Sequence, residues 1–440
     1  MFVKFSLATL FLLIAEIAVA QHESAAAQQM SMPGMENSVG YFSSGTSIEP
    51  KNTGETTPMV HKPIGSWTLL FHANSFLVNI QQSGPRGFDK LFAPNWLMPM
   101  VVRQSGRHTV MFRTMFSLEP ATVTDRRYPL LFQSGETAFG LPVVDGQHPH
   151  DLLMEISGRY DFNVSERTQL YVYGGPVGEP ALGPPAFPHR ASASENPLAV
   201  LGHHQEDSTH ISNSVVTLGL VSGPVQLEAS TFHGTEPDEN RWNLDGGVPN
   251  SFSSRLTVAA GGNFVGQFSM GRINNREALE PNLDTLRTTA SLIHYKRFSS
   301  GYVASSLIWG RNKDMESNER RIFNAYTLES TVNFLSKNWA WTRIENVDRD
   351  QTLVTGETHE AVHVGEEPIG RVQAFTFGYG RDLPVPWSSV KLGLGVQASV
   401  YGVPPALKPL YGDRPTGVAF FLRLRPAGNM SQHMQMMHRH

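Results

Sequence analysis

The feature that most constrains this chain is an alternation of apolar and polar residues in segments of about ten residues. The alternation is clearest in residues 151–164, 390–401 and 418–425. In each segment every second residue is apolar, and the positions between include charged residues such as Arg159 and Arg423. A period of two indicates β-strands that have one apolar face and one charged face.

The connections between these segments alternate in length. Short polar turns are expected near residues 104–106, 164–167, 222–224, 260–262, 298–300, 335–337 and 384–387. Longer connections are expected near 81–95, 119–149, 174–207, 234–249, 274–284, 312–321, 349–369 and 403–414. Short turns on one side and long loops on the other are typical of a closed antiparallel transmembrane β-barrel, as in bacterial outer membranes.

Counting these connections predicts an all-β barrel of sixteen strands with flexible N- and C-terminal tails. Fourteen is the next count, because the segments 96–103 and 168–174 are short. A soluble sandwich also alternates, so the alternation by itself leaves that fold open. In the barrel both tails emerge on the short-turn side, which is the periplasmic side, and the partner of the outer face is outer-membrane lipid.

The chain divides into four parts on composition. Residues 1–20 resemble a secretory signal peptide, with Lys4 before an apolar run and Ala18-Val19-Ala20 at the cleavage site. A membrane anchor is the alternative, but the uncharged run is too short for it. Residues 21–65 are expected to be a flexible periplasmic segment rich in Met, Ser and Gly, residues 66–425 the barrel, and residues 426–440 a Met/His-rich tail.

Composition excludes several functional classes. The chain has no cysteine, which excludes a disulfide scaffold, a Cys-based zinc site and a catalytic thiol. The net charge of -4 comes without a basic stripe, so we expect no nucleic-acid partner. Aromatic residues near strand ends are expected to form interfacial girdles or to pack ordinarily: Trp67, Trp96, Tyr171, Tyr173, Trp339, Trp341 and Trp387.

The two tails concentrate Met and His. Seven of the last eleven residues are of these types: Met430, His433, Met434, Met436, Met437, His438 and His440. The N-terminal segment adds Met30, Met32 and Met35. Thioether sulfur selects Cu(I) and imidazole suits Cu(II), Zn and Ni, so the tails predict metal binding with copper first. The alternative is an unstructured end without a role.

Two resemblances accompany these residues. A Met/His-rich periplasmic extension before an outer-membrane barrel, with the segment MSMPGM, is similar in architecture to the copper-resistance protein B family. The segments QHPHDLLMEISGRY (147–160) and LGHHQEDSTHIS (201–212) resemble a family of uncharacterised bacterial outer-membrane β-barrel proteins. The second resemblance implies a barrel and no particular activity.

Polar residues also gather in the long connections. A candidate site at the outer rim of the barrel comprises His148, His150, Asp151, His203, His204, Asp207 and His210. Imidazole and carboxylate together suit Zn, Cu(II) or Ni. Asp207, Ser208 and His210 suggest a hydrolytic set instead, although no G-x-S-x-G turn exposes the serine, and we assign no catalytic residue. The third interpretation is a loop network of His–carboxylate hydrogen bonds.

The inward faces of the expected strands carry charges of both signs: Glu155, Arg159, Asp161, Glu228, Glu329, Lys391, Arg423 and Arg425. This mixture predicts a general or plugged interior with salt bridges across it. The long Pro/Gly-rich connection 174–207 is expected to pack into the mouth or across it as a lid.

Three functions remain from the sequence. The first is a barrel involved in periplasmic copper binding, tolerance or export, with its tails in the periplasm. The second is an outer-membrane lipid hydrolase that uses rim His, Ser and Asp residues, although an enzyme is the less favoured class. The third is a porin-like or structural barrel whose tails are incidental.

Overall fold

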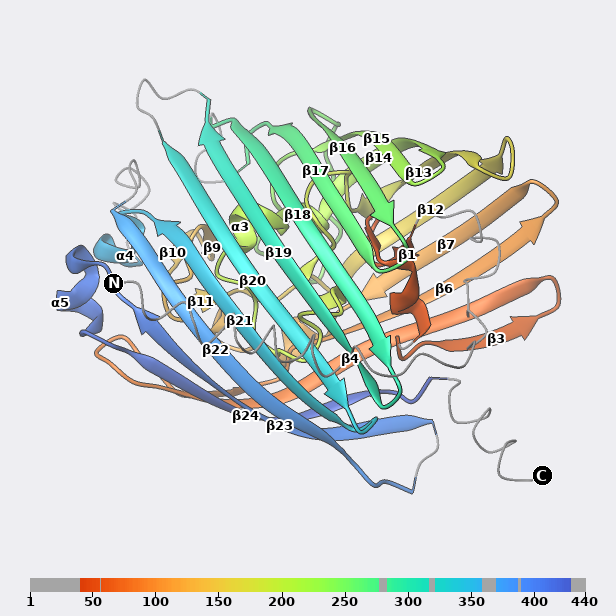
Figure 1. The fold of residues 1–440 in the computed structure, drawn as a ribbon. Coiled ribbons are helices and arrows are strands. Elements are labelled where there is room, and N and C mark those ends of the chain that lie inside the picture. The colour runs from red at the N-terminus through yellow and green to blue at the C-terminus, as the bar shows by residue number, and fades with distance from the viewer. Residues whose placement is uncertain are drawn as a thin grey trace.

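A computed structural model describes residues 40–55, 57–276, 283–315, 321–357, 369–386 and 389–428. The chain forms one closed antiparallel β-barrel with sixteen long strands (Figure 1). These strands are β4 (Trp67–Gln82), β6 (Asn95–Ser105), β7 (His108–Phe116), β12 (Leu153–Asn163), β13 (Thr168–Gly178), β14 (Ser212–Ser222), β15 (Val225–His233), β16 (Ser251–Ala260), β17 (Phe264–Ile273), β18 (Thr285–Phe298), β19 (Gly301–Asp314), β20 (Ile322–Phe334), β21 (Asn338–Arg349), β22 (Gly370–Leu383), β23 (Val390–Gly402) and β24 (Thr416–Pro426). The predicted fold class and strand count are confirmed.

The barrel closes where its last strand meets its first long strand. β24 pairs antiparallel with β4, from Gly417 opposite Gln82 to Leu424 opposite Ser75. Two short strands, β3 (Val60–Ile64) and β5 (Lys90–Phe92), also pair with β4. Closure pairs each of the sixteen long strands described here on both sides, which a sheet in lipid requires because lipid cannot hydrogen-bond to the backbone.

The period-two pattern sorts side chains between the two faces of the barrel as expected. Along β12 the residues Glu155, Ser157, Arg159 and Asp161 are buried inside, whereas Tyr160 is exposed outside. Exposed apolar side chains on other strands include Leu218, Leu307 and Leu394. An apolar outer band and a polar interior are the faces of a transmembrane barrel.

The inward-facing side chains are shielded from solvent. Thr217, Arg287 and Thr331 face the interior from β14, β18 and β20, and each is 0% exposed. In a barrel with a water-filled lumen such side chains would be wet. Other parts of the chain therefore fill the interior, and α3 is visible behind β19 and β20 in Figure 1.

Three segments of the chain occupy this interior or cover its ends. The N-terminal segment (residues 40–55) holds β1 (Tyr41–Phe42), β2 (Ile48–Glu49) and η1 (Lys51–Glu55). The second segment (residues 117–152) holds α2 (Glu119–Thr122), β8 (Tyr128–Pro129), β9 (Glu136–Ala138), β10 (Leu141–Val143) and β11 (Gly146–Gln147). The third, here called the lumenal segment (residues 179–211), holds η2 (Phe187–His189), α3 (His203–Glu206) and η3 (Ser208–His210).

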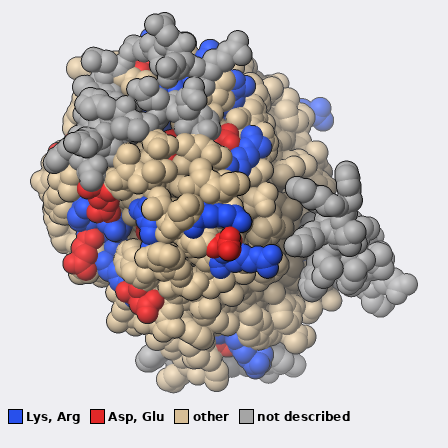
Figure 2. Space-filling model, turned by 90° about the vertical axis from the view of Figure 1, so that its left-hand side faces the viewer, with Lys and Arg blue, Asp and Glu red and all other residues tan. Residues whose placement is uncertain are grey.

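Further short helices lie in the long loops: α4 (Thr352–Thr355), η5 (Pro405–Leu407) and α5 (Lys408–Tyr411). Figure 2 views the end of the barrel at the left of Figure 1, where cationic and anionic side chains lie among uncharged ones. The long-loop pairs Arg86–Asp145, at 2.8 Å, and Arg126–Glu357, at 2.9 Å, are of this mixed kind. Among the described residues, no helix is long and apolar enough to cross a membrane.

The structure differs from one expectation and distinguishes between the two alternatives of another. Residues 40–55 and 57–64, expected within the flexible segment 21–65, form short elements, and Phe42 and Ile48 are buried in an apolar cluster. Burial of this apolar surface offsets the entropy lost in ordering the segment. The expected girdle aromatics Trp96, Tyr171, Tyr173, Trp339 and Trp341 are buried inside the barrel, which agrees with ordinary packing. Trp387 lies outside the described residues.

Candidate functional site: the filled lumen

The lumenal segment connects β13 to β14 and makes up much of the barrel's contents. None of its residues, from 179 to 211, is exposed. The segment had been expected to pack into the mouth or across it, and it packs inside. Its Pro and Gly residues prevent a long helix, so backbone groups of the segment need other hydrogen-bond partners. Side chains of the barrel wall supply several of them.

Arg190 connects two parts of the lumenal segment to each other and to the barrel wall. Its Nε donates to Glu329 Oε1 of β20 at 2.6 Å, and its Nη1 donates to Asp207 Oδ2 at 2.6 Å. Arg343 of β21 donates to the other oxygen of Glu329 at 3.1 Å. All four side chains are almost completely buried, so each charge depends on these partners for compensation.

Backbone contacts hold α3 against β18 and β19. The carbonyl oxygen of His204 accepts hydrogen bonds from Arg287 Nη2 at 2.5 Å and Asn312 Nδ2 at 2.8 Å. Gly310 of β19 allows this approach, because a Cβ there would lie 2.2 Å from the carbonyl oxygen of Gln205. The missing side chain of Gly310 thus lets α3 pack directly against the backbone of β19.

The N-terminal segment is held by a second buried ion pair. Arg255 of β16 donates to Glu228 Oε2 of β15 at 2.7 Å and to Thr46 Oγ1 at 2.8 Å. Thr46 Oγ1 also donates to Glu228 Oε1 at 2.5 Å. Arg113 of β7 donates to the carbonyl oxygen of Gly45 at 2.6 Å. Charged wall residues therefore fix this segment inside the lumen.

The inward-facing charges predicted from the sequence are found paired inside the barrel. Arg113 and Glu155 are 2.8 Å apart, and Arg159 and Asp161 are 2.7 Å apart. Arg423 and Arg425 both form ion pairs with Glu195 of the lumenal segment. The prediction of a plugged interior with salt bridges is in agreement with this arrangement.

The residues proposed for a rim site lie under the long loops and not on an exposed rim. His150, Asp151, His203, His204, Asp207 and His210 are buried, and His148 is half-buried. Three imidazoles gather around Phe187: the rings of His203 and His210 are 5.1 Å apart, and those of His150 and His210 are 5.5 Å apart. Of the predicted rim residues, the structure brings His150, His203 and His210 together, but inside the barrel, because the lumenal segment folds inward.

Carboxylates and carbonyls orient this imidazole group. His203 Nδ1 lies 2.7 Å from Asp207 Oδ1, and His150 Nδ1 lies 2.9 Å from Glu119 Oε2. His210 Nδ1 donates to the carbonyl oxygen of Asp207 at 2.9 Å. Burial, together with His203 and His150, lowers the pKa of His210 to about 3, so this imidazole is neutral. Burial raises the pKa of Asp207, but Arg190 and the hydrogen bond with His203 outweigh this and hold it below its ordinary value.

The predicted metal sites stay predictions. Within the described ranges, no three His, Asp or Glu side chains form a group that could hold a metal ion. The rim residues therefore agree best with the hydrogen-bonded network that was one of the three interpretations. The tail residues proposed to bind copper lie outside the described residues: Met30, Met32, Met35, Met430, His433, Met434, Met436, Met437, His438 and His440.

The hydrolytic interpretation finds no support in the local geometry. His210 Nδ1 is hydrogen-bonded to the main chain of Asp207 and not to its carboxylate. Ser208 Oγ is buried without a hydrogen-bond partner among the described residues. A serine nucleophile needs a base within hydrogen-bonding reach and an orienting group behind that base. The three residues do not form such a relay here.

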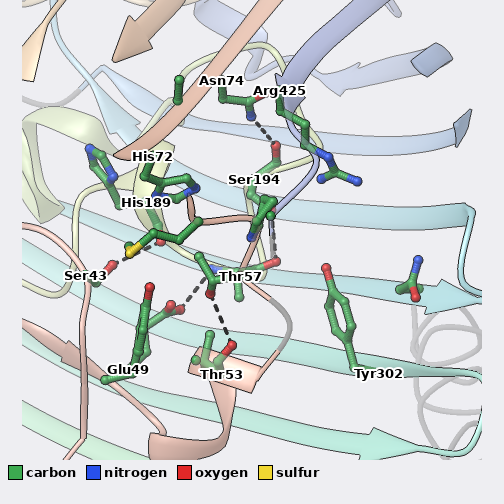
Figure 3. A pocket seen from close by; sticks show the side chains of 18 of the residues that line it. Ser43, Glu49, Thr53, Thr57, His72, Asn74, His189, Ser194, Tyr302 and Arg425 are labelled. Atoms are coloured by element: carbon green, nitrogen blue, oxygen red, sulfur yellow. Dashed lines mark hydrogen bonds between the residues drawn. The ribbon is translucent and has the colours of Figure 1, made fainter. Parts of the chain in front are cut away.

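One cavity of about 160 Å³ lies inside the barrel, between the N-terminal segment, the lumenal segment and the wall (Figure 3). His72 of β4 and His189 of η2 lie near each other on its boundary, while Tyr302 of β19 stands on another side. Its lining also includes Ser299 and Ser300, which join β18 to β19, so the cavity reaches toward the short-turn end. Sequence reasoning did not select His72 or His189, since each stands alone in its stretch of sequence.

Comparison with solved structures gives the same fold. An anion-selective porin from Comamonas acidovorans is 10% identical, with a TM-score of 0.50, and the match covers 82% of this chain and 99% of that one. OmpF of Salmonella typhi, solved with daunomycin, is 7% identical with a TM-score of 0.49 over 83% of this chain and 100% of that one. The channel DcaP of Acinetobacter baumannii is 11% identical with a TM-score of 0.45 over 83% and 99%.

The likeness is one of fold. At 10% identity the Comamonas porin shows that sixteen-stranded barrels of this architecture occur among porins, and it assigns no substrate to this chain. No protein-family model matches the sequence, and no curated protein matches it. The resemblances to the copper-resistance protein B family and to the uncharacterised barrel family therefore receive no support from these comparisons.

Proposed function

We propose that the protein is a porin-like channel of the bacterial outer membrane whose lumen is closed by its own chain. The observation that carries this proposal is a closed barrel with an apolar outer face and a polar, ion-paired interior that contains the lumenal segment. Lipid is the solvent that suits the outer face, which supports an outer-membrane location. Passage of a solute requires the lumenal or N-terminal segment to move.

The charges of the interior suggest what an opened lumen would select. Arg113, Arg159, Glu155 and Asp161 lie on neighbouring strands, so neither sign dominates this part of the wall. A strongly charge-selective pore concentrates one sign at its constriction. We therefore expect the opened channel to discriminate by size more than by charge.

Planar-bilayer conductance tests the proposal. The intact protein should conduct weakly, and a variant in which residues 180–206 are replaced by a short Gly/Ser linker should open to the conductance of a wide barrel. A variant without residues 40–55 should show an intermediate increase. Heat-modifiable mobility on gels provides the folding control for both variants. A folded linker variant that does not conduct would overturn the channel proposal, and full conductance of the intact protein would overturn its closure.

Periplasmic copper handling by the tails remains a second proposal, supported by their composition. Seven of the last eleven residues are Met or His, which are the donors that copper prefers. Removal of residues 429–440 should lower the copper bound per chain and the copper tolerance of cells that depend on this protein. Unchanged copper content and tolerance after the truncation would refute this role.

A further inference from the structure

The cavity described above has one wall composed largely of sulfur-bearing side chains. Met98 and Met100 project inward from β6, and Met111 and Met115 project inward from β7. These four residues, here called the thioether wall, are each at most 2% exposed. Met98, Met100 and Met111 line the cavity directly. Because inward positions on a strand are every second residue, two strands suffice to place four thioethers together.

Strand register sets an imidazole beside this wall. His72 of β4 is the direct partner of Met98, and Leu70 is the partner of Met100. Directly opposite residues of an antiparallel pair have Cβ atoms about 5 Å apart. The His72 side chain and the Met98 thioether therefore start from neighbouring points on the same inward face, and both line the cavity.

His189 enters from the lumenal segment, and its tautomer is fixed by sulfur. Its Nε2 lies 3.2 Å from Met115 Sδ. A thioether has no hydrogen to donate, so Nε2 must carry the proton and Nδ1 must hold the lone pair. Nδ1 is buried and has no hydrogen-bond partner among the described residues.

Trp96 connects the two imidazoles. Its ring centroid lies 4.3 Å from that of His189 and 4.7 Å from that of His72. Indole is the aromatic ring that interacts best with cations. Two imidazoles, several thioethers and an indole thus surround one space, as Figure 3 shows for His72 and His189.

The cations near the cavity are paired with carboxylates. Arg113 is paired with Glu155 at 2.8 Å, and Arg425 is paired with Glu195 at 2.9 Å. Lys391 is 3.9 Å from Asp382, so its compensation is weaker. Glu49 also lines the cavity, so the charges around it do not select between a monovalent and a divalent ion. The neutral sulfur and nitrogen donors do, because they prefer soft monovalent ions.

We propose that this cavity binds a soft monovalent cation, Cu(I) or Ag(I), through His189 Nδ1, the His72 imidazole and the thioethers of Met98 and Met100. Met115 does not bind the ion. It accepts a hydrogen bond from His189 Nε2 and so orients the ring, as groups behind a metal ligand commonly do. Ordinary apolar packing accounts for buried methionines. It does not account for His189 Nδ1, which is buried beside them without a hydrogen-bond partner among the described residues.

Silver binding to the full-length, detergent-solubilised protein tests the site, since Ag(I) is a redox-stable probe. The double variant Met98→Leu/Met100→Leu removes two sulfur donors while nearly conserving side-chain volume. Met154→Leu is the matched control, because Met154 is 0% exposed in the same apolar cluster but does not line the cavity. Both tails are intact in all three proteins, so silver bound by the tails cancels in the comparison.

The double variant should lose one tightly bound silver ion per chain, measured after competition with a chelator, whereas Met154→Leu should retain it. Equal silver content in the three proteins would overturn the site. Methyl resonances of the methionines in the unmodified protein give a second readout. Those of Met98 and Met100, identified by their absence from the single-variant spectra, should shift at one equivalent of Ag(I). Unshifted resonances would also refute the proposal. Neither result depends on whether the channel conducts.

Discussion

Replacing Gly310 with alanine should weaken the contact between α3 and the barrel wall. The new Cβ would lie 2.2 Å from the carbonyl oxygen of Gln205 and 2.9 Å from Cγ of Glu206. β19 cannot retreat, because β18 and β20 are hydrogen-bonded to it on both sides along most of its length. The helix must therefore move by roughly 1 Å to restore ordinary contact distances.

The cost of this movement follows from the contacts around α3. Overpacking of this kind costs about 1–3 kcal/mol. The shift also stretches the hydrogen bonds that the carbonyl oxygen of His204 accepts from Arg287 and Asn312, and each such bond contributes about 1 kcal/mol. If stretching removes about half of each of these two bonds, the total is about 2–4 kcal/mol. This corresponds to a roughly 30- to 700-fold increase in local opening, at about 1.4 kcal/mol per tenfold.

Hydrogen exchange of backbone amides in residues 203–210, followed by mass spectrometry, measures this opening. Gly266→Ala is the matched control, because a Cβ at that position of β17 would meet nothing within 4 Å. The control should exchange like the unmodified protein. If Gly310→Ala does so as well, contact between α3 and β19 does not hold the lumenal segment in place, and the reasoning fails.

Two further predictions concern charge. Arg190→Met should destabilise the lumenal segment by about 3–5 kcal/mol because it removes a buried cation from Glu329 and Asp207. Lys408→Met, which removes the ion pair of Lys408 with Asp413 in which both side chains are exposed, should cost at most about 1 kcal/mol, and equal effects in urea unfolding would contradict this reasoning. Burial raises the pKa of Glu179 from 4.5 to about 8. The unfolded state therefore loses its proton first, and the stability contributed by neutral Glu179 falls as pH rises from about 4.5 to about 8, by on the order of 5 kcal/mol. Glu179→Gln should weaken the pH dependence of unfolding between about pH 4.5 and pH 8, and an unchanged dependence would count against this assignment.

Strand alternation made the barrel predictable from sequence. A residue such as Arg159 between Gly158 and Tyr160 marks a strand with two chemically different faces, and the alternation of short and long connections orders the strands. The contents of the barrel were less predictable. Arg190 and His189 lie in a Pro/Gly-rich connection without periodicity, so no pattern indicates which wall residues they meet.

The candidate site was predictable only in part, for the same physical reason. His203, Asp207 and His210 are close in sequence, so their grouping could be inferred. His72 and His189 are brought together by the inward fold of a long loop, and no local spacing encodes that contact. The inward-facing charges of both signs were the one useful signal in the sequence. Because each buried charge needs a partner, they predicted ion pairs inside the barrel.

The seam between β24 and β4 has a consequence for biogenesis. The strand that seals the ring, Thr416–Pro426, follows the other strands in the chain, whereas the N-terminal segment anchored at Thr46 precedes them. In a finished ring, Thr46 would have to reach Arg255 and Glu228 in an interior that is already closed. We therefore expect the nascent wall to assemble around its own beginning. A chain halted before residue 416 should already protect residues 43–47 from protease, and their cleavage in that intermediate would show that the plug enters later.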